Sequence, residues 1–167
     1  MERAQLSQDI NTVFDEVIHT VNNIPGDTLN KLPFEDSWTI GQVAEHIILC
    51  SRDIPDRQVK EAERPYNEKE PALKGIFLDM EQKSKAAPVV TPQLPPHHKK
   101  ILLEKLNVNK IFLTKIIHEK DLKQLCLDME FPFMGYLTRY EWLHFISVHT
   151  RRHLNQIRNI QQYLSNQ

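Results

Sequence analysis

The sequence predicts an all-α protein, a four-helix bundle formed by a single domain over residues 1–167. Glycine is rare, with 4 residues in 167, and the longer segments repeat apolar residues three and four positions apart, which is the period of a helix and not of a strand. The hydrophobic content of 40% can supply a real core in a chain of this length. Four amphipathic segments, with long connections after the second and third, are typical of such a bundle.

Three of the helices follow from uninterrupted apolar stripes. The first is expected over about residues 3–24, and Pro25 and Gly26 then end it. The third is expected over about residues 97–119 and the fourth over about 138–164. Between the second and third helices, residues 65–96 carry six prolines around a short apolar island. We expect this segment to cross the surface of the bundle as a long connection, the kind of segment that often forms a lid or a binding loop.

The second helix has a capping residue at its start and a proline near its end. Thr39 can cap it, and its apolar face runs from Ile40 to Ile54. That face also holds His46. Pro55 should kink the helix or end its regular part, because proline removes a hydrogen bond to the preceding turn, and the helix can resume through Arg64.

Composition limits the cellular compartment and the binding partners that we expect. The net charge of −1 favours neither nucleic acid nor an anionic membrane as a partner. The N-terminus is polar, and no apolar run approaches the roughly 20 residues needed to span a bilayer. Cys50 and Cys126 fit free thiols in a reducing compartment. We therefore expect a cytoplasmic protein.

Three histidines on two core-facing helix surfaces are the strongest indication of chemistry. His149 and His153 lie one turn apart on the fourth helix, so their rings can face one metal ion. His46 interrupts the apolar face of the second helix. A buried imidazole needs partners for its nitrogens, and either a metal or a neighbouring carbonyl or carboxylate can satisfy it. In bundles, ligands that project inward from facing helices commonly form metal sites.

Two stretches of the sequence resemble one family. Residues 38–47, with the sequence WTIGQVAEHI, look like the first motif of the DinB/YfiT-like superfamily, which has a tryptophan, a small hydroxyl residue and an aliphatic residue before a helix that carries a histidine. Residues 149–156, HTRRHLNQ, are similar to its second motif, in which two histidines precede a glutamine. The order and spacing fit over essentially the whole chain. Asn155 departs from the glycine frequent there, which concerns helix packing more than metal binding.

The resemblance implies a divalent metal ion, zinc or nickel, held by His46, His149 and His153. Three neutral imidazoles leave a coordination position for water, the arrangement of catalytic and not of structural zinc sites. Imidazole suits several metals, so the ligands do not name the ion. An open metal can activate water or a thiol, which matches the family's transfer of low-molecular-weight thiols and its metal-dependent hydrolysis. The resemblance thus implies a small-molecule substrate, and relatives are often homodimers.

Several side chains close in sequence to these histidines can be interpreted in two ways. Cys50 can close the site as a fourth ligand or pack as a small hydrophobic residue. Gln156 can orient a ligand or the bound water, or can be an ordinary amide on the helix face. Glu45 adjoins His46, but adjacent helical residues point about 100° apart, so we expect it to be solvated.

The remaining histidines and the arginines of the fourth helix are expected to lie outside the site. His97 and His98 should form a solvated helix start, His144 should face away from the ligands, and His19 and His118 should lie at the surface or in an interface. Three arginines can meet an anionic substrate or form a charged outer face: Arg151, Arg152 and Arg158.

Motifs that the chain lacks narrow the chemistry further. The residues after His149 are Thr150 and Arg151, so the glutamate of a His-Glu-x-x-His metalloprotease is missing. The sequence contains neither a glycine-rich phosphate loop nor a Gly-x-Ser-x-Gly elbow. Two hypotheses remain: a metal-dependent thiol transferase or hydrolase, and a non-enzymatic bundle with a structural or vestigial metal that serves dimerisation or partner binding.

Overall fold

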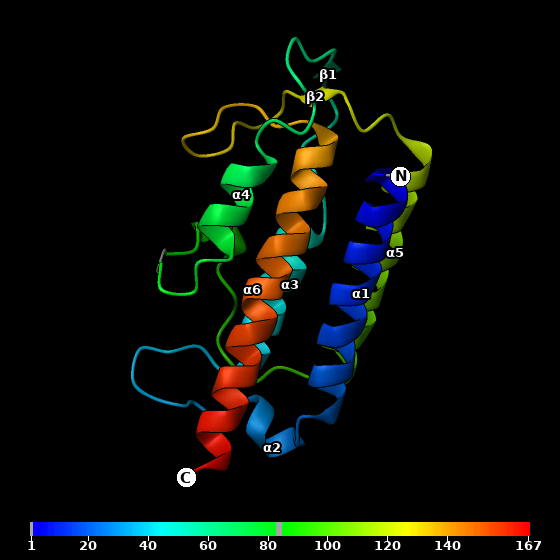
Figure 1. The fold of residues 1–167 in the computed structure, drawn as a ribbon. Helices are drawn as coiled ribbons and strands as arrows, with labels where there is room; N and C mark the ends of the chain where they lie inside the picture. Colours follow the sequence, from blue (N-terminus) through cyan, green and yellow to red (C-terminus); the bar gives the residue numbers. More distant parts are fainter. Residues whose placement is uncertain (1, 83–84) are drawn as a thin grey trace.

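Four long helices packed side by side form the body of the protein in a computed structural model that describes residues 2–82 and 85–167 (Figure 1). They are α1 (Glu2–Asn23), α3 (Ile40–Ser51), α5 (Lys99–Glu119) and α6 (Arg139–Ser165). Around the bundle they follow the order α1, α5, α3 and α6, and α6 packs back against α1. The predicted all-α four-helix bundle is confirmed.

The core lies between these helices because each turns one apolar stripe inward. In α1 the buried positions recur every three or four residues from Leu6 to Val21, the spacing of a single helix face. Burying one large apolar side chain contributes about 1.5–3 kcal/mol, so the four stripes together hold the bundle closed. The largest completely buried side chains of the long helices include Ile10, Phe14, Ile40, Ile47, Leu106, Leu113 and Ile117.

The second predicted helix is shorter than expected, and the expectation that it resumes through Arg64 is wrong. Helix α3 ends at Ser51, before Pro55, which lacks the N–H that a helix would need. Downstream, the carboxylate of Asp128 accepts hydrogen bonds from the backbone N–H groups of residues 57 and 58 at 2.6 and 3.1 Å. The chain then forms β1 (Val59–Lys60), which pairs antiparallel with β2 (Leu125–Cys126) in the second connection.

The long connection is more ordered than its prolines indicate. It contains α4 (Glu70–Phe77) and the 3₁₀ turn η1 (Pro88–Val90), and a short α2 (Gly26–Leu29) precedes α3. Helix α4 lies beside α6 (Figure 1) and anchors Leu73 in the core, while η1 packs against α3. The connection therefore covers the two helices that carry the histidines. Among the described residues, no helix has both the length and the apolar character needed to cross a membrane.

Candidate metal centre

Helix α3 presents His46 to α6 because its start is fixed. The side chain of Thr39 accepts a hydrogen bond from the Gln42 N–H at 3.2 Å, and the Gln42 side chain accepts one from the Thr39 N–H at 3.0 Å. This capping box satisfies two N–H groups that a helix start leaves free. His46 lies almost two turns further on and is buried, with 4% of its surface exposed. The ring of Trp38, which precedes the cap, lies 5.1 Å from the His46 ring.

Helix α6 begins with a second capping box, between Thr138 and Glu141. Glu141 is completely buried and also accepts two hydrogen bonds of 2.7 Å from the guanidinium of Arg64 and one of 2.8 Å from the Lys69 N–H. These contacts tie the start of α6 to the long connection. Two turns later, His149 is buried and faces α3.

The three histidine rings meet between α3 and α6. The ring centre of His46 lies 5.2 Å from that of His149 and 4.6 Å from that of His153, and the last two lie 4.5 Å apart. The Nε2 atoms of His149 and His153 are separated by 3.1 Å. The structure thus brings together the three residues that the sequence predicts as metal ligands, and we call them the histidine cluster.

Hydrogen bonds to oxygen define the tautomers of two rings in the histidine cluster. His46 Nδ1 lies 2.7 Å from the carbonyl oxygen of Val90, and His153 Nδ1 lies 2.7 Å from Oε1 of Gln156. Both oxygens are acceptors, so each Nδ1 carries the proton and each Nε2 keeps a free electron pair in the neutral ring. This is the arrangement in which an outer oxygen orients a metal-binding imidazole.

The environment keeps these rings uncharged at neutral pH. Burial lowers the pKa of His46, although its hydrogen bond to Val90 acts in the opposite direction. Burial, reinforced by the other two histidines, lowers the pKa of His149 well below its usual value, and burial lowers that of His153 to about 4. A neutral imidazole is the form that binds a metal. The neutral rings are therefore in the chemical form that a divalent ion requires of its imidazole ligands.

Cys50 lies beside the histidine cluster, one turn after His46. Its Sγ is 3.6 Å from His46 Nε2, and ligand atoms of His46, Cys50 and His149 all lie within 4.8 Å of one another. Burial raises the pKa of the Cys50 thiol to about 12, so without an ion the sulfur is protonated. Both readings of Cys50, fourth ligand and packed thiol, are compatible with this position.

Aromatic rings enclose the histidine cluster on the side of α4. Phe77, at the end of α4, lies 5.5 Å from the His149 ring, and Phe145, one turn before His149, lies 5.0 Å from it. Phe131 stacks edge-on against both phenylalanines. These rings exclude water from one side of the site. Phe145 could have been recognised from its position four residues before His149, whereas Phe77 and the Val90 carbonyl have no local pattern that points to the site.

Two expectations about the surface of α3 are wrong. Glu45 is not solvated: its carboxylate accepts hydrogen bonds of 2.7 Å from His97 Nε2 and from the Gln93 N–H. His97 is not a solvated helix start, because its side chain is only 8% exposed against α3. The cause is the connection, which returns across α3 just before α5 begins.

The other histidines lie where the sequence places them. His144 is away from the histidine cluster, buried beside Tyr140 with Nδ1 4.0 Å from Glu70. The three exposed histidines are His19, His98 and His118.

The arginines of α6 are engaged in contacts with the chain. Arg151 and Arg158 approach Glu16 of α1 at 3.7 and 3.1 Å. Arg152 donates to the carbonyls of Asp79 and Gln82 in the long connection. These contacts support a charged outer face that fastens neighbouring segments to α6.

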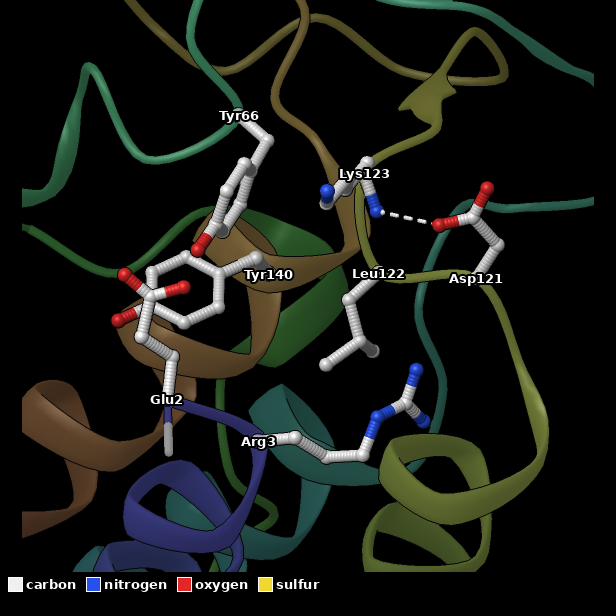
Figure 2. Close-up of a pocket in the computed structure, with 7 residues that line it drawn as sticks. All are labelled: Glu2, Arg3, Tyr66, Asp121, Leu122, Lys123 and Tyr140. Carbon is white, nitrogen blue, oxygen red and sulfur yellow. Dashed lines mark hydrogen bonds between the residues drawn. The ribbon is translucent and has the colours of Figure 1, made fainter.

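The pocket in Figure 2 is separate from the histidine cluster. It has a volume of about 110 Å³ and lies where the start of α1 meets the start of α6. Tyr140, which lines it, precedes His149 by nine residues, about 13.5 Å along the helix. A shallower hollow of about 430 Å³ lies between α3 and α5. Neither contains a residue of the histidine cluster. The lining of the first comprises Glu2, Arg3, Tyr66, Asp121, Leu122, Lys123 and Tyr140 (Figure 2).

Comparison with known proteins gives a family match that spans most of the chain. A family model described as the DinB superfamily matches residues 10–157, a range that includes all three histidines. The chain is also 28% identical over 165 residues to the uncharacterized protein YuaE of Bacillus subtilis (strain 168), a match that covers 90% of this chain and 96% of that protein. No solved structure matches the chain.

Proposed function

The chain belongs to the DinB superfamily, and from this premise we propose that it is a metal-dependent enzyme that acts on a small molecule. In this proposal His46, His149 and His153 hold one divalent ion, zinc or nickel. The observation that carries it is the convergence of three neutral imidazoles, of which His46 and His149 are buried and His153 is half-buried. Two of them, His46 and His153, keep Nδ1 protonated on an oxygen acceptor.

The chemistry follows from three nitrogen donors. A divalent ion with such ligands lowers the pKa of a bound water or thiol toward neutrality and so supplies a nucleophile. The chain contributes the surroundings: Val90 and Gln156 hold protons on the outer ring nitrogens, and the rings of Phe77 and Phe145 keep water away from His149. These features support transfer of a low-molecular-weight thiol to an electrophile, or hydrolysis of a small substrate.

Metal analysis tests the proposal directly. The untagged protein, purified without a nickel column, should contain about one divalent ion per chain by elemental mass spectrometry, as expected for one three-histidine site. His149→Ala should lose the ion and keep its helical circular dichroism, whereas His19→Ala, which changes an exposed histidine of α1, should retain it. A folded native protein without metal that also fails to take up added zinc would refute the proposal.

Activity is then tested on the loaded protein. A panel that pairs low-molecular-weight thiols with alkylating electrophiles, and a second panel of small esters and amides, should show turnover that His153→Ala abolishes. A reaction that persists in His153→Ala would not come from this site.

Cys50 favours a second candidate function, a non-enzymatic bundle with a structural metal. Its sulfur lies close enough to His46 to close the coordination sphere, and a closed sphere is characteristic of structural sites. Substitution by cobalt separates the two: a thiolate-to-cobalt charge-transfer band that disappears in Cys50→Ala supports the structural site, while its absence from the wild type supports the open one.

We propose a cytoplasmic homodimer, on the basis of the resemblance of the two histidine motifs to the family. Light scattering during size-exclusion chromatography should give twice the mass of the 19.7 kDa chain, and the mass of a single chain would contradict it.

A further inference from the structure

The segment before α5 lies across α3 and contacts the histidine cluster through its backbone. We call residues 85–98 the strap. Its regular structure among the described residues is the single turn η1, which ends at Val90. The carbonyl of Val90 is the acceptor, 2.7 Å away, that keeps the proton of His46 on Nδ1. The tautomer of His46 therefore depends on where the strap lies.

Glu45 is the charged side chain that fastens the strap to α3. One of its carboxylate oxygens, Oε2, accepts hydrogen bonds of 2.7 Å from the Gln93 N–H and from His97 Nε2. These two donors lie three and seven residues after Val90. Hydrogen bonds to a carboxylate are stronger than those between neutral groups, and the pair is largely shielded from water, with side-chain exposures of 17% for Glu45 and 8% for His97.

The geometry of α3 explains how this helix can carry both His46, a predicted metal ligand, and Glu45, the residue that holds the strap. Adjacent helical residues point about 100° apart, so Glu45 reaches the strap while its neighbour His46 faces α6. Gly41, one turn before Glu45, gives the strap room: a Cβ at this position would lie 2.9 Å from Cβ of His97. Asn30 also holds the backbone of His97: its Oδ1 accepts from the His97 N–H at 2.7 Å and its Nδ2 donates to the His97 carbonyl at 3.0 Å.

We propose that Glu45 is a positioning residue for the histidine cluster. It holds the strap against α3, and the strap's Val90 carbonyl in turn presents His46 with Nε2 toward His149 and His153. This role in metal binding rests on the proposed function. The effect of Glu45 on the His46 tautomer, however, can be measured in the protein without a metal.

The first experiment uses the metal-free protein with ¹⁵N-labelled histidine at pH 8. Long-range ¹H–¹⁵N spectra should show wild-type His46 as the single Nδ1–H tautomer. Glu45→Ala should give a mixture of tautomers, whereas Glu45→Gln, which keeps an oxygen able to accept from Gln93 and His97, should resemble the wild type. Asp15→Asn is the matched control, because it removes a carboxylate that binds Lys110 at 2.7 Å between α1 and α5, away from the strap.

The second experiment measures zinc affinity by competition with a chromophoric chelator. Glu45→Ala should bind zinc roughly 10–100-fold more weakly, the usual effect of losing an outer partner of a ligand, and Glu45→Gln and Asp15→Asn should change it little. Gly41→Ala perturbs the same contact from the other side and should reproduce both the tautomer mixture and the weaker binding. If circular dichroism shows that Glu45→Ala does not fold, Gly41→Ala replaces it in both experiments.

The outcomes separate the two proposals. A single Nδ1–H tautomer in Glu45→Ala and Gly41→Ala would overturn the positioning role. If wild-type protein binds no zinc but the tautomer still shifts in both variants, the metal function fails and the positioning role of Glu45 stands.

Discussion

His149 and His153 face each other across one turn of α6, with 3.1 Å between their Nε2 atoms. The Nδ1 proton of His153 is committed to Gln156, so its Nε2 has only an electron pair to offer. In the protein alone, His149 can donate to that electron pair. A cation between the two rings would use the same electron pair, which makes this contact the place where metal and proton compete.

Removing the amide of Gln156 should weaken metal binding without unfolding the bundle. Gln156→Leu takes the acceptor from His153 Nδ1, so the ring is free to turn and to protonate either nitrogen. We expect zinc affinity to fall by roughly 10–100-fold, measured by chelator competition. Gln162→Leu is the same change at an exposed position of α6 and should have no effect. Equal affinities for Gln156→Leu and the wild type would show that Gln156 does not orient the ligand.

The bundle and the convergence of the three histidines were predictable because both depend on short periods. His149 and His153 are four residues apart, so the helical repeat places them together before any tertiary structure is known. His46 lies on the inward face of its own helix, and in a bundle inward faces meet. The phase of both helices is set by capping boxes formed by residues three apart, Thr39 with Gln42 and Thr138 with Glu141.

The parts that were not predicted depend on contacts distant in sequence. Val90 reaches His46 through a backbone carbonyl, a group that every residue has, across 44 positions. Glu45 and His97 are 52 positions apart, and each taken alone looks like a surface residue. Strand β1 has only two residues, too few to show an alternating pattern. Tertiary packing and not local preference determines these features.

The two thiols should be inert in the folded, metal-free protein. Burial raises the pKa of Cys50 and of Cys126 to about 12, so almost no thiolate exists at pH 8. We expect both to react with iodoacetamide at least roughly 100-fold more slowly than in urea, where an ordinary thiol has a pKa near 8.5. Mass spectrometry after peptide digestion gives the rate for each cysteine. Rapid alkylation of Cys50 alone in the native protein would mean that its sulfur is an accessible nucleophile.

The buried carboxylate of Glu141 should be important for stability. It caps α6 and binds Arg64 while completely shielded from solvent. Glu141→Ala removes the cap and leaves Arg64 without its partner, and we expect a loss of about 3 kcal/mol in the free energy of unfolding, measured by urea denaturation. Lys74→Ala breaks an exposed pair with Glu70 and should cost less than about 0.5 kcal/mol. Similar small losses of unfolding free energy in both variants would contradict a stabilising role for the buried carboxylate of Glu141.

Asp56 should make the protein sensitive to acid. Burial alone would raise the pKa of this carboxyl, but hydrogen bonds from Lys120 and Arg139, both 2.7 Å long, outweigh burial and lower it below its ordinary value of 3.8. A lowered pKa in the folded state stabilises the protein above the ordinary value, and the stabilisation is lost as pH falls through the folded-state pKa.

The comparison of wild type with Asp56→Asn isolates this contribution. The variant should be less stable at pH 7, where the wild-type carboxylate is charged and paired with Arg139. The difference in unfolding free energy should stay constant from pH 7 to about 5 and shrink below about pH 4, as protonation removes the wild type's advantage. Urea denaturation at pH 7, 5, 4 and 3 provides the measurement. A difference that is independent of pH over this range would show that the pairing of Asp56 does not lower its pKa.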